Sequence, residues 1–423
     1  MASSAAGFPN LRTEIAGHSV ADLAASFGTP LYIYDAAKIL QRLADLRRFD
    51  AVRYAQKACS NLAILDLLRR HGSLVDAVSA GELRRAVAAG YSIEGDPPPV
   101  VYTADIFDSE SLPLCVEWGV HVNCGSPDMI DQLGARARGR EITLRINPGF
   151  GHGHSRKTNT GGDQSKHGIW HTELGDCLDR AARYDLRVTG VHAHIGSGSD
   201  LEHLAQVCGG LEQAAIGIGP QLRMVSVGGG LPIPYREDEA YVDVEAYFAL
   251  CDAMRKRLQE RFAHPLRLEI EPGRYLVGES GYLVAEIRAV KRQAENTFYL
   301  LDAGFNNLAR PILYGAYHPM SIVPADGNTD RSDHEVIVGG PLCESGDIFT
   351  QEEGGFVSQR RLPHAQVGDL LVIECAGAYG FVMGSNYNSK PMAAEVLLRE
   401  GAAYLIRRRQ TFEDIVRGEI IPG

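Results

Sequence analysis

Long apolar runs, paired cysteines and an excess of positive charge are all missing from this sequence of 423 residues. No apolar run approaches the roughly 20 residues that a membrane-spanning helix needs, and the first residues lack the charged and apolar stretches of a signal peptide. The eight cysteines form no Cys-x-x-Cys pair, which argues against a disulfide framework and favours free thiols. The net charge of −11 disfavours binding to nucleic acid or to anionic membranes. We therefore expect a cytoplasmic protein with no nucleic-acid or membrane partner.

The sequence also has no internal repeat, no low-complexity linker and no Gly-x-Gly-x-x-Gly motif in its first strand–helix unit. The missing glycine motif disfavours a doubly wound dinucleotide-binding sheet, although that fold stays open as the alternative. A hydrophobic fraction of 45% and a charged fraction of 22% are typical of a globular protein. A chain of 423 residues is too long for one ordinary core, so we expect two domains.

Strand-like apolar runs alternate with amphipathic helical stretches from about residue 50 to residue 271. The runs are 52–57, 74–78, 100–103, 120–123, 142–147, 188–194, 224–227 and 266–271. Eight strand–helix units in about 230 residues predict an α/β fold of the (β/α)8 TIM barrel type.

The pattern changes near residue 282. Later strand candidates, such as 297–301, 335–338, 370–374 and 394–398, are separated by clusters of Gly, Pro, Asn and Asp with few helices. This texture favours a C-terminal, mostly β domain. We predict that residues 36–282 form the barrel domain and that residues 1–35 and 283–423 form the β domain, because a strand at 31–35 can pair with the later strands.

Lys57 stands at the end of the first predicted barrel strand, where an apolar alternation ends. Functional residues of barrels gather at the carboxyl ends of the strands, and a lysine amine can form a Schiff base with a carbonyl cofactor. A surface lysine at a strand edge is the alternative. Nearly every other predicted strand end carries a polar or glycine residue, namely Asp76, Ser79, Thr103, Asn123, Arg145, Asn147, His192, His194, Gly228 and Glu271. This concentration favours a functional Lys57.

Two segments after the last predicted strands suit a phosphorylated, ring-containing cofactor. Gly228–Gly230 follows the seventh strand, and bare backbone N–H groups in that loop can approach a phosphate, although a tight turn explains three glycines equally well. Glu271-Pro272-Gly273-Arg274 follows the eighth strand. The Glu271 carboxylate can face a pyridine nitrogen, and the Arg274 guanidinium can bind a phosphate or carboxylate. A strand-end ion pair is the alternative.

The motif His192-x-His194 offers a rival interpretation, because its spacing places both imidazoles on one face of a strand, as in some metal sites. Metal-binding barrels usually carry this motif on the first strand, with further ligands at later strand ends. Here it lies on the sixth strand, and the later ends offer Gly and Glu. We therefore predict no metal site and expect His194 to stack on or hydrogen-bond to a ring, with Ser197 available for a phosphate oxygen.

The β domain carries its own polar set. Arg310 and Tyr314 form one group, and Gly377-Ala378-Tyr379 another. Cys343 lies in a Gly/Pro/acidic loop with Glu344, and neighbouring acidic groups discourage thiolate formation. A protonated thiol that donates a proton therefore suits Cys343 better than a nucleophile does. A buried, inert cysteine is the alternative.

Taken together, these motifs resemble one family across almost the whole chain. The segments that carry the resemblance are Tyr54–Ala58, Asp76–Glu82, Arg145–Gly149, His192–Gly198, Gly228–Gly230, Glu271–Arg274, Cys343–Asp347 and Ser385–Ser389. They are similar to those of the diaminopimelate decarboxylases, pyridoxal-phosphate enzymes with an alanine racemase-like (fold-type III) barrel. The segments Gly149–Ser155 and Ser165–Gly168 resemble the enterobacterial branch. Lys390 departs from the arginine that the family pattern has before Pro391.

The resemblance implies a role for each site residue. Decarboxylation of meso-2,6-diaminopimelate to L-lysine and CO2, the last step of lysine biosynthesis, is the implied reaction, with Lys57 and Cys343 as catalytic residues. The implied cofactor-binding residues are Lys57, His194, Ser197, Gly228, Gly229, Gly230, Glu271, Gly273, Arg274 and Tyr379, and the implied substrate-binding residues are Arg274, Arg310, Tyr314, Glu344 and Tyr379. The family also implies a homodimer with active sites at its interface, to which the partner subunit supplies the cysteine loop.

Three other functions are weighed against this one. A related amino-acid decarboxylase or racemase is the second hypothesis, but racemases of this fold pair the ring nitrogen with Arg, and Glu271 argues against one. A non-catalytic cofactor-binding homologue is disfavoured by the presence of Lys57, Glu271 and Cys343 together. A metal-dependent barrel hydrolase is the least supported.

Overall fold

The computed structural model describes residues 7–150, 161–194 and 201–423, and the chain divides into two compact units. One unit comprises residues 40–232 and 242–276; the other comprises residues 1–39, 233–241 and 277–423. Residues 233–241 thus group with the second unit, although they lie between strands of the first in sequence. Among the described residues, no helix is long and apolar enough to cross a membrane.

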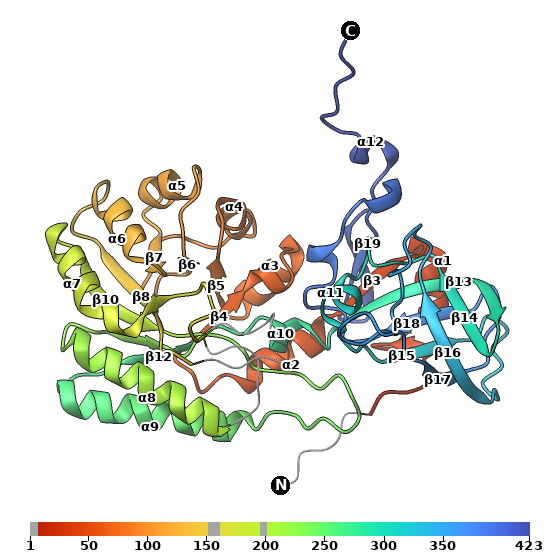
Figure 1. The fold of residues 1–423 in the computed structure, drawn as a ribbon, viewed down its shortest axis with the longest axis horizontal. Coiled ribbons are helices and arrows are strands. Elements are labelled where there is room, and N and C mark those ends of the chain that lie inside the picture. Colours follow the sequence, from red (N-terminus) through yellow and green to blue (C-terminus); the bar gives the residue numbers. More distant parts are fainter. Residues whose placement is uncertain (1–6, 151–160, 195–200) are drawn as a thin grey trace. The chain divides into compact units, whose positions relative to one another are not determined.

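Parallel strands of the first unit close into a barrel (Figure 1). Within the described residues, the ring runs β4 (Ala51–Ala55), β5 (Leu74–Ala77), β6 (Val100–Ala104), β7 (His121–Cys124), β8 (Glu141–Asn147), β10 (Arg187–His192), β11 (Met224–Ser226) and β12 (Arg267–Ile270). The ring closes because β12 pairs with β4 and β8 pairs with β10. The short β9 (Ile169–Trp170) adds to β8 outside the ring. The predicted (β/α)8 barrel is confirmed.

Helices connect the barrel strands. They are α3 (Leu62–Arg70), α4 (Ala80–Ala88), α5 (Ser111–Glu117), α6 (Pro127–Gly134), α7 (Leu174–Arg183), α8 (Leu201–Ile218) and α9 (Val244–Phe262). Two of these helices begin at serines just after a strand, where the Ser79 and Ser126 hydroxyls accept from the backbone N–H groups of Glu82 and Met129. Side-chain capping of this kind satisfies amide groups that the first helical turn leaves without partners.

The interior of the barrel contains a buried ion pair. Arg53 on β4 and Glu269 on β12 are both about 1% exposed, and their side chains approach to 3.0 Å. Burial alone would raise the pKa of Glu269, but the charges of Arg53 and Arg267 lower it below its usual value. The Arg53 guanidinium also donates to the Pro98 carbonyl at 2.7 Å. A buried ion pair of this kind depends on both partners being present.

We expect the substitution Arg53→Met to lower the free energy of unfolding by about 3 kcal/mol, because it leaves the Glu269 carboxylate buried with one cation fewer. Urea unfolding followed by circular dichroism measures this change. The matched control is Arg187→Met, which removes an ion pair to Glu141 whose side chains are 65% and 49% exposed. That loss should stay below about 1 kcal/mol. Equal losses in the two variants would contradict a structural role for the buried pair.

The second unit contains a mainly antiparallel sheet. Its strands run in the order β17 (Arg360–Pro363), β16 (Asp333–Gly339), β14 (Asn296–Leu301), β13 (Gly281–Gln293), β3 (Leu31–Asp35), β19 (Ala394–Arg399) and β20 (Ala402–Arg407), and β18 (Leu370–Ile373) joins β13 to β15 (Met320–Val323). The hairpin of β1 (Glu14–Ile15) and β2 (His18–Ser19) precedes α1 (Val20–Phe27), and α11 (Arg310–Tyr314) and α12 (Phe412–Ile415) come later in the chain. The early strand β3 pairs with β13 and β19, as the sequence suggested. Each border between the units falls inside a helix or a loop, the helices being α2 (Ala36–Asp45) and α10 (Arg274–Val277).

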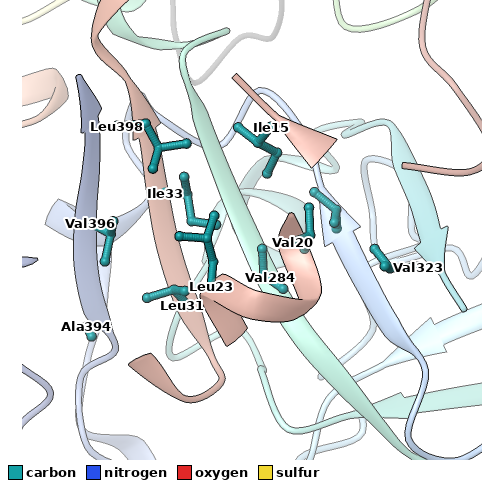
Figure 2. Packing of buried hydrophobic residues seen from close by; sticks show 11 residues of the cluster. Ile15, Val20, Leu23, Leu31, Ile33, Val284, Val323, Ala394, Val396 and Leu398 are labelled. Atoms are coloured by element: carbon teal, nitrogen blue, oxygen red, sulfur yellow. The ribbon is translucent and has the colours of Figure 1, made fainter. Parts of the chain in front are cut away.

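Helix α1 and the central strands of this unit share one apolar core (Figure 2). Its members are Ile15, Val20, Leu23, Leu31, Ile33, Val284, Val323, Val372, Ala394, Val396 and Leu398, each at most 5% exposed. Because β3 comes from the start of the chain and β19 from its end, this core ties both ends of the sequence into one folded unit.

Candidate active site

Lys57 lies in a single helical turn directly after β4. The strand ends at Ala55, two residues before the predicted end, and Gln56–Ala58 forms a 3-10 turn. Within that turn Gln56 and Ala58 are buried, whereas Lys57 is exposed. The turn also meets the segment after β12, because the Ala55 N–H donates to the Pro272 carbonyl at 3.1 Å. An accessible amine therefore stands at the carboxyl end of the barrel, where barrel enzymes place their chemistry.

Two carboxyl groups lie close to the Lys57 amine. Asp76, at the end of β5, has its pKa raised well above the usual value by burial and by the Glu271 charge, and the Thr103 hydroxyl and the Lys57 charge oppose this rise. Burial also raises the pKa of Glu82, again against the charge of Lys57. The Glu82 carboxylate accepts from the Val78 N–H at 2.8 Å, which holds it in place. Lys57 therefore lies within electrostatic reach of one buried and one half-buried carboxyl group.

Both oxygens of the Glu271 carboxylate receive hydrogen bonds at this end of the barrel. It is 6% exposed, and its Oε2 atom lies 2.8 Å from Nε2 of His192, while Oε1 accepts from the Ser226 hydroxyl at 3.2 Å. Burial would raise its pKa, but the His192 charge and hydrogen bond, with the Arg53 charge, lower the pKa to about 2. The group is thus an ionised carboxylate near neutral pH, able to pair with a cationic ring nitrogen.

The glycine loop after β11 packs so closely that side chains do not fit. A Cβ on Gly228 would lie 2.3 Å from the Ala193 carbonyl oxygen, and one on Gly229 would lie 2.4 Å from the Glu271 carbonyl oxygen. Gly228 also has a φ of +66°, which favours glycine. The third residue, Gly230, has a φ of +108°. The loop therefore lies directly beside Glu271 with its backbone bare, as a phosphate-binding loop requires.

His194 is fixed by this same loop. The Gly229 N–H donates to Nδ1 of His194 at 3.0 Å, so the ring carries its hydrogen on Nε2 when neutral. Burial and the charges of Lys57 and Arg145 lower the pKa of His194 well below its usual value, so the imidazole is neutral at physiological pH. A neutral, oriented ring suits stacking. Ser197, predicted to bind phosphate, lies outside the described residues.

The remaining predicted residues of the barrel end follow β12. Gly273 packs against the Lys57 turn, since a Cβ built there would lie 3.3 Å from both the Ala55 carbonyl and the Ala58 Cβ. Arg274 begins α10 and is half-buried. The structure therefore brings the segment that carries Glu271 and Arg274 next to the turn that carries Lys57.

Arg310 is buried in the second unit. Its guanidinium donates to Nε2 of His318 at 2.8 Å and lies 4.9 Å from the centre of the Tyr235 ring. His318 in turn donates from Nδ1 to the Glu374 carbonyl at 2.9 Å, so the imidazole is neutral and its orientation is fixed. Tyr314, the last residue of the same short helix, is half-buried. Arg310 thus places a buried positive charge beside the His318 imidazole and the Tyr235 ring.

Cys343 sits in an ordered loop of the second unit. Both oxygens of Asp347 brace the loop, accepting from the Leu342 and Phe305 N–H groups at 2.8 Å. The Cys343 N–H donates to the Asn388 side chain at 2.8 Å, which joins two of the motifs that carry the family resemblance. The Cys343 and Glu344 side chains are exposed, so the buried-cysteine alternative for Cys343 is wrong. Tyr379, also in this unit, is half-buried and has a φ of +57°.

Comparison with known proteins identifies the family. The family described as "Pyridoxal-dependent decarboxylase, pyridoxal binding domain" matches residues 36–278. The diaminopimelate decarboxylase of Escherichia coli (strain K12) is 50% identical over 411 residues, which cover 97% of this chain and 98% of that protein. The chain belongs to the diaminopimelate decarboxylase family.

Solved structures of this family share the whole fold. A crystal structure of diaminopimelate decarboxylase matches with a TM-score of 0.91 and 51% identity, over 93% of this chain and 94% of that one. The diaminopimelate decarboxylase from Helicobacter pylori, complexed with L-lysine, matches with a TM-score of 0.82 and 30% identity, over 94% of this chain and 98% of that one. As a member of the family, this chain is a carboxy-lyase that uses pyridoxal phosphate, and the predicted fold class, enzyme class and cofactor are confirmed.

The barrel end fits the cofactor of diaminopimelate decarboxylases. It combines an accessible amine at Lys57 for a carbonyl carbon, an ionised carboxylate at Glu271 for a ring nitrogen, and a bare glycine backbone for a phosphate. It also holds buried oxygen atoms without hydrogen-bond partners in the described part of the chain, on the side chains of Gln56, Asp76 and Asn123. Buried polar atoms are rarely left unpaired unless a ligand or water meets them.

Several polar residues at this barrel end have partners that the sequence pattern does not predict. His192 and Ser226 hold Glu271, and Asp105 after β6 accepts from both the His167 ring (2.5 Å) and the Gly168 N–H (2.8 Å). The available signal was proximity in sequence: His192 precedes His194 by two residues, and Ser226 precedes Gly228 by two. No comparable signal linked Asp105 to His167.

Proposed function

We propose that this family member decarboxylates meso-2,6-diaminopimelate to L-lysine and CO2 at the carboxyl end of its barrel. The observation that carries the location is that the accessible Lys57 amine and the ionised, buried Glu271 both act on the buried Asp76 carboxyl group at this end of the barrel. The name of the 50% identical relative and the L-lysine complex of the Helicobacter pylori protein support the choice of substrate and product. No observation favours a second function.

The residues that would hold the cofactor divide by chemistry. Lys57 would bind its carbonyl carbon, and Glu271 its ring nitrogen, which the carboxylate keeps protonated. The His194 imidazole, neutral and held by Gly229, would stack on the ring. The groups proposed for the phosphate are Ser197, Gly228, Gly229, Gly230, Gly273, Arg274 and Tyr379. Bound in this way, pyridoxal phosphate supplies an electron sink for the electron pair that remains when the substrate carboxylate departs as CO2.

Side chains of the protein would supply and hold the protons of this reaction. The Lys57 amine would give way to the substrate amine, and its charge would then act on the neighbouring Asp76 and Glu82 carboxyl groups, whose pKa values it lowers against the effect of burial. Cys343 would donate the proton that replaces the lost carboxylate on the carbon, in keeping with its exposed side chain. Breaking the bond between the α-carbon and its carboxylate would release CO2, and the C–H bond that replaces it would take the one proton from Cys343.

The second unit would recognise the far end of the substrate, which bears both a carboxylate and an ammonium group. The buried guanidinium of Arg310 and the Tyr314 hydroxyl suit the carboxylate, together with Arg274 and Tyr379, and the exposed Glu344 suits the ammonium. A decarboxylase of ornithine or lysine would have no use for an arginine at this position. Diaminopimelate is therefore the substrate that matches both charges.

The test of this function is turnover of defined substrates. Purified protein with added pyridoxal phosphate should release CO2 from meso-diaminopimelate and form L-lysine in equal amounts. L-ornithine, L-arginine and L-lysine serve as competing substrates, and their turnover should be at most a small fraction of that rate. Faster turnover of ornithine or arginine, with no lysine formed from diaminopimelate, would overturn the proposed substrate.

We expect Cys343→Ala to lower turnover by about 10²-fold, because loss of a positioned proton donor costs that order of rate. Retention of the cofactor's visible absorption would show that the site is otherwise intact. The matched control is Cys375→Ala, which removes a buried thiol of the same unit. Wild-type turnover in Cys343→Ala would clear this cysteine of proton donation.

The same variant tests the proposed homodimer, in which Cys343 of the partner subunit completes each site. Mixing inactive Lys57→Ala and Cys343→Ala proteins should restore about a quarter of the wild-type activity, since about half of the dimers then hold one intact site. No recovery after verified subunit exchange would place both residues in one subunit's site. We further propose the domain borders 36–282 and 1–35 with 283–423, and a cytoplasmic location, where the eight free thiols would stay reduced.

A further inference from the structure

The first histidine of the His192-x-His194 motif has no part in the function proposed above. His192 ends β10, is 1% exposed, and directs Nε2 to Oε2 of Glu271 at 2.8 Å. A carboxylate at this distance can only accept, so Nε2 carries a hydrogen. The other ring nitrogen, Nδ1, is buried and has no hydrogen-bond partner in the described part of the chain. The hydrogen bond to Glu271 is therefore the polar contact of this buried ring in the described part of the chain.

One ring nitrogen of this buried imidazole is left without a hydrogen-bond partner in the described part of the chain. Burying a polar nitrogen without a partner costs free energy, and one hydrogen bond offsets only part of the cost. An apolar side chain would fill the same space without that cost. The arrangement makes sense if its purpose is to hold the Glu271 carboxylate.

Ser226 completes the support of Glu271 from the neighbouring strand β11. Its hydroxyl donates to Oε1 of Glu271 at 3.2 Å and accepts from the Gly228 N–H at 3.2 Å. The Glu271 N–H also donates to the Gly228 carbonyl at 2.8 Å. One serine thus links the carboxylate for the ring nitrogen to the loop for the phosphate, and so sets the spacing between the two.

We propose that His192 and Ser226 are positioning residues that hold the Glu271 carboxylate toward the ring nitrogen of the cofactor. With each oxygen of Glu271 receiving one hydrogen bond, the carboxylate cannot rotate freely, and its remaining lone pairs keep a fixed direction. In metal sites, loss of a residue that supports a ligand in this way changes affinity or activity by about 10- to 100-fold, and we expect a loss of the same order here. The two histidines of the motif then have distinct roles: His192 orients Glu271, and His194 stacks on the ring. The inference rests on the proposed role of Glu271.

The experiment compares five variants of the full-length protein loaded with pyridoxal phosphate, of which Glu271→Gln removes the carboxylate itself. His192→Phe keeps the ring shape and removes the donor, His192→Gln restores an N–H donor, and Ser226→Ala removes the hydroxyl. The matched control is His121→Phe, which removes a histidine that bonds to the Thr143 hydroxyl at 2.9 Å at the other end of the barrel. The readouts are the visible absorption of the bound cofactor from pH 6 to pH 9, kcat and KM for meso-diaminopimelate, and thermal unfolding.

His192→Phe should lower kcat by about 10- to 100-fold with little change in KM, and should move the pH-dependent change in cofactor absorption toward lower pH, because a misplaced Glu271 holds the ring proton less firmly. His192→Gln should recover most of both effects, and Ser226→Ala should show a smaller loss of the same kind. His121→Phe should leave spectrum and kcat unchanged.

Wild-type spectra and kcat in His192→Phe, or an equal loss in His121→Phe, would overturn the inference. If His192→Phe does not fold, His192→Gln and Ser226→Ala decide the matter: an unchanged spectrum and kcat in Ser226→Ala would then count against it. Glu271→Gln distinguishes the positioning role of His192 from the proposed role of Glu271 itself. A changed spectrum in Glu271→Gln with none in the His192 variants overturns the positioning role alone, whereas an unchanged spectrum in Glu271→Gln overturns the role of Glu271 and this inference with it.

Discussion

Replacing Lys57 with alanine is expected to abolish the visible absorption of covalently bound cofactor and to lower turnover by about 10³-fold or more, because the exposed Lys57 amine is the group proposed to bind the carbonyl carbon. Absorption spectroscopy measures the first effect, and CO2 release the second. In the wild-type protein, borohydride treatment followed by mass spectrometry should find the cofactor attached to the peptide that contains residue 57.

The control for this variant is Lys256→Ala, which removes an exposed lysine of the same unit that pairs with Asp252. It should keep the spectrum, the turnover and the labelled peptide of the wild type. A Lys57→Ala protein that retains the bound-cofactor absorption, or a label found on another lysine, would remove Lys57 from its proposed role. Because the amine is exposed and Asp76 and Glu82 lie near it, we expect Lys57→Ala to lose the absorption of the bound cofactor.

Replacing Glu271 with glutamine is expected to lower kcat by about 10²- to 10³-fold, which is the usual cost of removing one preorganised electrostatic group. The amide keeps the size of the side chain but cannot hold a proton on the ring nitrogen, so the electron sink weakens. Steady-state kinetics with meso-diaminopimelate and the visible spectrum of the bound cofactor report the change. Glu141→Gln, at the amino end of the barrel, is the matched control and should behave as the wild type. A Glu271→Gln protein with wild-type kcat would contradict the proposed pairing.

The pKa of Glu271 adds a pH dependence with a definite sign. Its carboxyl group has a pKa of about 2 in the folded protein against an ordinary value of 4.5, so the unfolded chain binds more protons between these limits. The interaction therefore stabilises the fold fully above about pH 4.5 and is lost as the pH falls toward 2. Urea unfolding of the cofactor-free protein should show a steeper loss of stability over that interval in the wild type than in Glu271→Gln. Parallel curves would contradict the shift.

Much of the barrel could be predicted from local pattern alone. Runs of apolar residues bounded by polar ends identified all eight ring strands, because each strand is buried on both faces and so carries a continuous apolar signal. Strand ends were less certain. The predicted first strand reached Lys57, whereas β4 stops at Ala55, because pairing ends where the chain turns to meet the Pro272 carbonyl. That contact joins segments more than 200 residues apart in sequence, and no local pattern reports it.

The candidate site divides in the same way. Its reactive types and their places at strand ends could be read from the sequence, because parallel strands of a barrel all present their carboxyl ends at one face. The partners of these residues could not. His192 meets Glu271 across 79 residues, and Asp105 meets His167 across 62, only because barrel closure sets their strands and loops in register. Neighbouring charges then decide the pKa: burial raises it in both groups, but the Glu271 charge adds to the rise at Asp76, whereas the His192 charge and hydrogen bond lower the pKa of Glu271.

The sequence by itself therefore determined the (β/α)8 barrel, the later β strands, the family and the residue types that carry the chemistry, since these depend on periodicity and on short motifs. Only the tertiary structure decided that β3 lies between β13 and β19, that Lys57 sits in a turn near Asp76 and Glu82, and that the His192 ring meets Glu271. The physical reason is that hydrogen-bond partners and the electrostatic field of a buried group are set by neighbours in space, which chain closure brings together from distant parts of the sequence.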